Sequence, residues 1–286
     1  MLVNFIAEVS SNHNQSIDRC FEFIDQSALI GCNAVKFQLF RIDQLFAPEI
    51  LKKNSDISKR VQWELPIEYI PLLAKRCHEK GIAFGCTPFD IEAVSILEPY
   101  VDFFKIASYE LLWHDLISAC CSANKPLILS SGMATIEEIK KAVNVAKKYG
   151  CSDLSLLHCI SGYPTPLEQC NLAAINTLRE STNVKQIGWS DHSVSPTVLY
   201  RAINHWGASI IEFHLDLEGE GEEFKSGHCW LPEQIKPIIE SVKLLKEIDG
   251  TGIKGPVDIE KEERDWRADP QDGLRPLKHI RAKYVV

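Results

Sequence analysis

The sequence predicts an α/β protein built as a single closed (β/α)8 barrel, the TIM barrel, with a C-terminal extension. Short apolar runs alternate with longer segments that have helical spacing, and there are eight of each. Strands separated by helices of this length pair in parallel through right-handed crossovers. The chain has 286 residues, which suits one barrel of about 250 residues with an extension.

The predicted strands are nearly continuous apolar runs, as expected for a parallel sheet that is buried on both faces. In chain order they cover residues 3–9, 33–40, 82–89, 101–108, 126–132, 154–161, 186–192 and 208–215. An open doubly wound sheet is the alternative arrangement. Its dinucleotide-binding form has no support, because no G-x-G-x-x-G motif follows the first strand.

The predicted helices carry recognisable start and stop signals. Thr135 and Glu138 form a capping-box pattern, and Gly81 and Gly150 follow helical segments as C-terminal signals. The helical segments cover residues 17–29, 67–80, 91–100, 112–123, 135–149, 172–181, 197–206 and 232–248.

We expect residues 1–248 to form the catalytic barrel. Residues 249–286 are rich in glycine, proline and charge, and we expect a tail that packs on the barrel or on a partner. Residues 41–66 form a long connection after the second strand. Such connections build the active-site rim of a barrel.

Composition excludes several classes of function. A net charge of −8 argues against a nucleic-acid partner but allows a locally basic pocket for a small anion. No apolar run reaches membrane-spanning length, and the first residues do not resemble a signal peptide. The ten cysteines include no C-x-x-C pair, which indicates free thiols in a reducing compartment. We therefore expect a cytoplasmic protein without membrane contact.

Lys36 and Lys105 are lone charges inside strands that otherwise look buried. Strand alternation places Lys36 and Gln38 on one face. Lysine is rarely buried unless it is paired, so two interpretations stand. The ammonium groups hold a phosphate or carboxylate, or form a Schiff base, in the barrel mouth; alternatively they form structural ion pairs, for example with Glu8 or Glu110.

His192 and His214 end the seventh and eighth predicted strands, which are neighbours in a closed barrel. Two imidazoles in that position can share a divalent metal, with Asp191 or Glu212 orienting them. The alternative is a pair of hydrogen-bonded core histidines. The turn at residues 130–133 has small residues before a helix, which suits a phosphate or a plain turn.

Taken together, these motifs resemble those of the sialic acid (N-acetylneuraminate) synthase family. The matching segments are AEVSSNHNQS, AVKFQLF, CTPFD, FKIASYE, LILSSGMATIEEI, LLHCISGYPTP, IGWSDHS and IIEFHLDL. The resemblance implies a transferase of carbohydrate biosynthesis. It would condense phosphoenolpyruvate with an amino-sugar aldehyde such as N-acetylmannosamine, release phosphate, and form a nonulosonic acid with the help of Mn²⁺ or Mg²⁺.

The resemblance also implies roles for individual residues. The catalytic set would be Glu8, Lys36, Lys105 and Glu110. The substrate-binding set would be Gln38, Thr87, Ser108, Ser131, Ser161, Tyr163 and Ser190, with Ser161 at the position of a family asparagine. The metal ligands would be His192 and His214.

Two departures from the family pattern set further expectations. The family carries a C-terminal antifreeze-like domain whose arginine reaches a partner's active site. We expect the barrel without that domain, with Arg264, Arg267, Arg275 or Arg281 as substitutes, and leave both a monomer and a homo-oligomer open. The family's G-P-D loop is replaced by GEGEEFKSGHCW, where Glu222, Glu223 and His228 are candidate acids or bases. A lysine Schiff-base aldolase and a non-catalytic binding subunit are the alternative functions.

Overall fold

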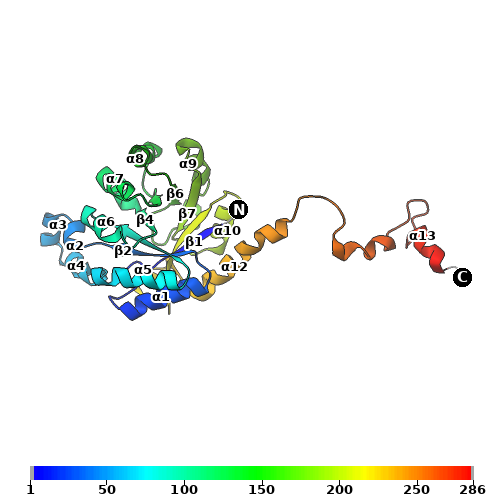
Figure 1. Ribbon diagram of the computed structural model, residues 1–286, viewed down its shortest axis with the longest axis horizontal. Coiled ribbons are helices and arrows are strands. Elements are labelled where there is room, and N and C mark those ends of the chain that lie inside the picture. Colours follow the sequence, from blue (N-terminus) through cyan, green and yellow to red (C-terminus); the bar gives the residue numbers. More distant parts are fainter. Residues whose placement is uncertain (1–2, 285–286) are drawn as a thin grey trace. The chain divides into compact units, whose positions relative to one another are not determined.

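The computed structural model describes residues 3–284 and confirms the closed barrel. Eight parallel strands pair in chain order, and β1 also pairs with β8, which closes the ring (Figure 1). The strands are β1 (Asn4–Glu8), β2 (Ala34–Leu39), β3 (Ala83–Pro88), β4 (Phe103–Ile106), β5 (Leu127–Ser130), β6 (Leu154–Cys159), β7 (Gln186–Asp191) and β8 (Ile210–Leu215).

A ninth strand, β9 (Cys229–Trp230), pairs in parallel with the end of β8 and was not predicted. Two residues are too few to produce a strand pattern in the sequence. Only the pairing of Cys229 with His214 and of Trp230 with Leu215 makes this segment a strand.

Eight longer helices alternate with the strands and surround them (Figure 1). They are α1 (Ile17–Leu29), α5 (Ile70–Glu79), α6 (Ile91–Leu97), α7 (His114–Ser122), α8 (Ile136–Lys148), α9 (Ala174–Thr182), α10 (Pro196–Asn204) and α12 (Pro232–Asp249). In α8 the residues Ile139, Ala142, Val143 and Ala146 are buried. That spacing forms one apolar stripe against the barrel. The predicted capping box of Thr135 and Glu138 is present at the start of this helix.

Short helices occupy the connections. The segment between β2 and α5 contains α2 (Ile42–Leu45), α3 (Pro48–Lys53) and α4 (Ser55–Ser58), and α11 (Glu222–Lys225) lies between β8 and β9. Helix α13 (Lys278–Arg281) lies near the C-terminus. No helix within residues 3–284 is both long and apolar enough to cross a membrane. All ten cysteines are free thiols, as predicted.

Strand periodicity places a polar layer directly above an apolar layer inside the barrel. The apolar cluster consists of Ile6, Ala34, Phe103, Ile128, Leu157 and Ile210. Side chains two residues apart share a face of a strand. The residues two positions further along are Glu8, Lys36, Lys105, Ser130, Cys159 and Glu212, and all of them line one cavity. The apolar core of the barrel therefore lies directly beneath the polar residues that form the floor of the candidate site.

The polar layer also depends on a glycine. Gly85 of β3 pairs with Lys36 on one side and with Phe103 on the other. A Cβ atom at Gly85 would lie 2.1 Å from the ring of Phe103. The missing side chain lets that ring fill the barrel beneath the lysines.

The chain divides into two compact units, with the boundary between Leu244 and Leu245 inside α12. The second unit has a small polar network of its own, in which Asp269 accepts hydrogen bonds from the backbone amides of Gln271 and Lys278. Arg281, one of the four arginines considered as substitutes for the family's arginine, forms an ion pair with Asp272 at 2.8 Å.

Candidate active site

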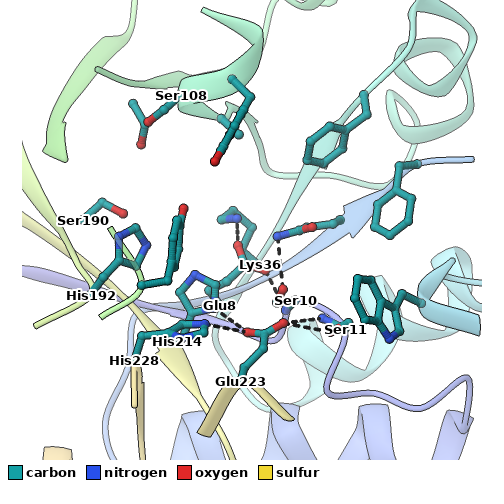
Figure 2. A pocket seen from close by; sticks show the side chains of 18 of the residues that line it. Glu8, Ser10, Ser11, Lys36, Ser108, Ser190, His192, His214, Glu223 and His228 are labelled. Atoms are coloured by element: carbon teal, nitrogen blue, oxygen red, sulfur yellow. Dashed lines mark hydrogen bonds and ion pairs between the residues drawn. The ribbon is translucent and has the colours of Figure 1, made fainter. Parts of the chain in front are cut away.

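A cavity of about 520 Å³ lies at the C-terminal ends of the strands (Figure 2). It gathers nine of the thirteen residues to which the family resemblance gave catalytic, substrate-binding or metal roles. These nine are Glu8, Lys36, Gln38, Lys105, Ser108, Tyr163, Ser190, His192 and His214. The four that do not line it are Thr87, Glu110, Ser131 and Ser161.

The two lysines are fixed by buried carboxylates at the floor of the cavity. Lys36 is ion-paired with Glu8, and its Nζ lies 4.0 Å from Glu212 Oε2. Lys105 Nζ lies 3.0 Å from Glu212 Oε1, which also accepts a hydrogen bond from Ser190. The two interpretations of the lysines are thus compatible, because these ammonium groups are ion-paired and also line the cavity.

Burial and charge act against each other in this network. Burial lowers the pKa of Lys36 to about 8, although Glu212 opposes the shift. Burial alone would raise the pKa of Glu212, but the ammonium groups of Lys105 and Lys36 together lower it. Glu212 therefore stays ionised and holds both lysines in place.

Several hydroxyl groups near the lysines lack partners within the described residues. Oγ of Ser130 and Oγ of Ser161 are buried and make no hydrogen bond there. Ser108 Oγ accepts a hydrogen bond from the amide of Gly132 at 3.0 Å. A Cβ atom at Gly132 would lie 2.4 Å from Ser161 Oγ, so this glycine lets the β5 turn approach both serines.

Three of the four residues outside the cavity lining have clear local environments. Thr87 accepts a hydrogen bond from Lys36 Nζ at 3.2 Å and so supports the lysine. The hydroxyl of Ser131 donates to the carbonyl of Leu157 at 2.9 Å, away from the cavity. Burial raises the pKa of Glu110 to about 7, so this carboxyl group is partly protonated near neutral pH.

The histidines form an aromatic cluster on one wall of the cavity. The ring centroids of His192 and His214 lie 5.2 Å apart, and His228 lies 5.1 Å from His214. Tyr163 packs on His192 at 4.1 Å. Burial lowers the pKa of His192 to about 3, so its imidazole is neutral at physiological pH and can bind a metal ion.

The groups that orient these histidines differ from the ones expected. Nδ1 of His192 lies 2.8 Å from the carbonyl of Ile160, and Nδ1 of His214 lies 2.8 Å from Glu223. Asp191 and Glu212 have other hydrogen-bond donors instead: the indoles of Trp189 and Trp230 donate to Asp191, and Lys105 donates to Glu212 Oε1.

Asp191 instead anchors the loop that follows β8 through hydrogen bonds. Its two oxygens accept hydrogen bonds at 2.9 Å from the indole groups of Trp189 and Trp230. Ser193 and the amide of Val194 also donate to it. Since Trp230 belongs to β9, this buried carboxylate ties the end of the loop to β7.

The same loop brings Glu223, one of the candidate acids or bases, into the site. Glu223 accepts a hydrogen bond from the hydroxyl of Ser11 at 2.8 Å as well as contacting His214. Burial opposes ionisation of Glu223, but hydrogen bonds from His214 and His228 hold its pKa well below the usual range. The sequence signal was weak: Glu223 and His228 were two of three candidates in a loop without a strand pattern.

An aromatic wall faces the cavity from the connection between β2 and α5. Phe40, Phe46 and Trp63 of this connection line the cavity, together with Phe89, which follows β3. The guanidinium of Arg60 lies 5.1 Å from the ring of Trp63 and 5.9 Å from that of Phe46. This is the arginine of the cavity lining, and it comes from the barrel rather than from the tail.

Comparison with known proteins agrees with this arrangement. The NeuB family profile matches residues 23–254. An uncharacterized protein of Methanocaldococcus jannaschii is 36% identical over 90% of this chain and 75% of its own length. N,N'-diacetyllegionaminic acid synthase of Campylobacter jejuni is 32% identical over 87% and 78%. The crystal structure of the N-acetylneuraminic acid synthetase of Leptospira borgpetersenii superposes with a TM-score of 0.80 at 31% identity, covering 92% of this chain and 90% of that one.

Proposed function

This chain belongs to the NeuB family, and we propose that it condenses phosphoenolpyruvate with an amino-sugar aldehyde to form a nonulosonic acid. The relatives above include synthases named for legionaminic and N-acetylneuraminic acids. The observation that carries the proposal is the pair of buried lysines on the floor of a cavity that also holds an imidazole cluster and the unpartnered hydroxyl of Ser130.

The lysine side of the cavity suits phosphoenolpyruvate. The ammonium groups of Lys36 and Lys105 would bind its carboxylate and phosphate, and Ser108 and Ser130 would donate hydrogen bonds. Ser190, whose hydroxyl donates to Glu212, would contact the same substrate. Donors that are already fixed in position stabilise developing negative charge without reorganisation. Glu8 and Glu212 are essential to this arrangement because they fix the lysines.

In the proposed reaction, the double bond of phosphoenolpyruvate supplies the electron pair that joins its methylene carbon to the aldehyde carbon of the sugar. The π bond of the aldehyde breaks as this bond forms, and its oxygen takes up a proton to become a hydroxyl group. Water then adds to the resulting cationic carbon, and the carbon–oxygen bond to phosphate breaks as phosphate leaves. The proton released by water needs an acceptor, and we propose that Glu8, a carboxylate of the cavity lining, accepts it.

The imidazole wall suits a divalent cation. We propose that His192 and His214 bind it; when bound it would supply Lewis-acid polarisation of the sugar aldehyde. His228 Nδ1 is buried without a hydrogen-bond partner among residues 3–284, which fits a wall built to hold an additional group. Of Mn²⁺ and Mg²⁺, imidazole nitrogen suits the transition ion better.

The aromatic wall is the proposed acceptor side. Four residues of the connection after β2 line the cavity on this side: Phe40, Phe46, Arg60 and Trp63. Aromatic rings present flat apolar surface, and a guanidinium group donates to carbonyl or charged substituents. This combination suits a sugar that carries acylated amino groups.

The proposal is tested with purified full-length protein, phosphoenolpyruvate, Mn²⁺ and a panel of N-acylated amino-sugar aldehydes. The expected result is phosphate release that depends on one of the sugars, with one sugar acid formed per phosphate. Borohydride trapping with pyruvate serves as the contrasting measurement. A covalent adduct on Lys36 or Lys105, without phosphate release, would overturn the proposal in favour of an aldolase.

A further inference from the structure

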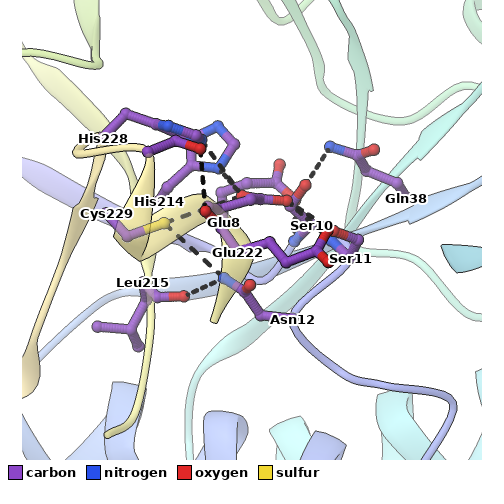
Figure 3. Close-up of polar contacts among 12 residues, drawn as sticks. Glu8, Ser10, Ser11, Asn12, Gln38, His214, Leu215, Glu222, His228 and Cys229 are labelled. Carbon is purple, nitrogen blue, oxygen red and sulfur yellow. Dashed lines mark hydrogen bonds and ion pairs between the residues drawn. The ribbon is translucent and has the colours of Figure 1, made fainter. Parts of the chain in front are cut away.

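The loop after β8 brings three potential metal ligands to one point beside His214 (Figure 3). Glu223 enters from α11, and His228 and Cys229 enter at the start of β9. One ligand atom from each of these residues and from His214 lies within 4.8 Å of all the others. Glu223 and the His228–Cys229 pair come from different parts of the loop, and they converge on His214 because both ends of the loop are anchored.

Both ends of this loop are anchored independently of any ligand. Arg19 pairs with Asp216 and Glu218 at its start, and Asp191 holds Trp230 at its end. Ser11 donates to Glu223 through its amide and its hydroxyl. The cluster is therefore positioned by the surrounding structure.

We propose that Glu223 and His228 are direct ligands of the divalent cation and complete a centre around His214. This inference rests on the proposed function, which requires a cation at the imidazole wall. It adds two ligands from a loop whose sequence departs from the G-P-D pattern. Its donor set is two imidazole nitrogens and one carboxylate oxygen, alongside the neighbouring His192.

The distances between the donor atoms fit a common metal. Glu223 Oε2 lies 2.8 Å from His214 Nδ1 and 3.5 Å from His228 Nε2. Ligands about 2.1 Å from a tetrahedral ion are roughly 3.4 Å apart, and octahedral neighbours are closer. The observed separations span this range, so a small movement of the side chains accommodates an ion.

Burial and charge favour the same conclusion. The side chain of Glu223 is 16% exposed and that of His228 is 8% exposed. Nδ1 of His228 has no hydrogen-bond partner among the described residues. Burial of a carboxylate is costly unless positive charge or hydrogen-bond donors compensate it, and a divalent cation at this cluster would supply positive charge.

Cys229 supports this centre without binding the cation. Its Sγ lies 3.8 Å from both Glu223 Oε2 and Asn12 Nδ2. A nitrogen and oxygen donor set suits Mn²⁺, Fe²⁺, Co²⁺ and Zn²⁺, and disfavours Mg²⁺, which prefers an all-oxygen shell. The predicted order of affinity therefore places Mg²⁺ last.

Calorimetric titration of the full chain with Mn²⁺, Co²⁺ and Mg²⁺ tests the proposal. His228→Asn and Glu223→Gln should each lower Co²⁺ affinity at least about tenfold, as expected for groups that bind or orient a metal. Glu220→Gln in the same loop and His205→Ala on the surface are the matched controls and should retain affinity. Circular dichroism of each variant shows that the fold is kept.

The visible absorption of the Co²⁺ form provides a second readout. Loss of either ligand should change the intensity of the cobalt ligand-field bands, whereas Cys229→Ser should leave them unchanged. A sulfur-to-cobalt charge-transfer band in the near ultraviolet would overturn the proposed donor set. Unchanged affinity in both Glu223→Gln and His228→Asn, with weaker binding in His192→Ala, would also overturn it and leave the proposed function standing. Failure of the proposed function would appear differently, as metal binding without any sugar-dependent phosphate release.

Discussion

At the scale of single residues, Lys105 and Glu212 combine a structural and a catalytic role. They form a buried pair at 3.0 Å. Removing one member leaves an uncompensated charge, whereas replacing both with neutral groups can be nearly neutral for stability. This difference separates the two roles experimentally.

We expect Lys105→Met to abolish measurable turnover and to lower the free energy of unfolding by roughly 3 kcal/mol. Lys105→Met with Glu212→Gln should regain most of that stability but no activity. Urea unfolding and phosphate release measure the two effects. If the double variant recovered activity together with stability, Lys105 would have only a structural role.

Lys36 gives the site a defined dependence on pH. Burial lowers its pKa from the ordinary value of 10.5 to about 8, so the ammonium that would bind the anion is lost above that pH. We expect kcat/KM for phosphoenolpyruvate to fall as pH rises through about 8. A pH–rate profile measures this, and Lys36→Arg should move the falling limb to higher pH; an unmoved limb would assign it to another group.

The stability of the fold responds to Lys36 in the opposite direction. Between about 8 and 10.5 the unfolded lysine keeps its proton while the folded one has lost it. The unfolded state then binds more protons, so the contribution of this lysine to stability rises with pH over that window. Activity and stability should therefore change in opposite senses above pH 8.

The proposal that the aromatic wall binds the sugar acceptor can be tested at Arg60. Its guanidinium lies 5.9 Å from the ring of Phe46 and 5.1 Å from that of Trp63, and Arg60 lines the cavity. We expect Arg60→Ala to raise KM for the sugar about tenfold or more, equivalent to about 1.4 kcal/mol, with little change in KM for phosphoenolpyruvate. Steady-state kinetics with each substrate varied in turn measures the split. An equal effect on both substrates would place Arg60 outside an acceptor subsite.

At the scale of elements, the loop from Asp216 to Trp230 is anchored at its end by the buried carboxylate of Asp191. Asp191 accepts hydrogen bonds from Trp189, Trp230, Ser193 and Val194. Groups left without a partner in such a place cost about 1–3 kcal/mol each. This carboxylate therefore fixes the position of the end of the loop, which the sequence pattern of the loop does not encode.

We expect Asp191→Asn to lower the free energy of unfolding by about 3 kcal/mol and to weaken Mn²⁺ binding by displacing β9. Asp153→Asn, at an exposed position, is the control. Thermal unfolding and metal titration measure the two effects. Normal metal affinity in a destabilised Asp191→Asn protein would show that the loop keeps its position without this anchor.

At the scale of the whole molecule, the boundary between the two compact units lies inside α12. We propose that residues 1–248 are a barrel domain that folds alone, and that residues 249–286 form a separate tail. The second unit leaves large apolar side chains exposed, with Ile253 at 82% and Ile259 at 88%. Such exposure is typical of surfaces that meet another chain.

A chain ending at residue 248 should therefore retain cooperative unfolding and bind phosphoenolpyruvate, while its self-association is weakened. Light scattering after size exclusion, together with urea unfolding, measures this. The full chain with Ile259→Asp is the matched control for the apolar contact. Loss of folding in the shortened chain would show that the tail is part of the barrel domain.

The sequence alone determined the barrel, because strand and helix periodicity are local properties that burial imposes directly on side chains. It also placed Lys36, Gln38, Lys105, His192 and His214 at one rim, and these five residues line the cavity. Their strands end at the same edge, so the position along each strand was sufficient to bring them together.

The tertiary structure decided what local pattern does not encode. It gave the lysines Glu212 as their shared partner, because two residues far apart in the chain meet only when the barrel closes. It turned Ser131 toward Leu157 and brought Glu223 and His228 to His214. Loop residues have no period that fixes their direction, so their contacts follow from the anchors at Arg19 and Asp191.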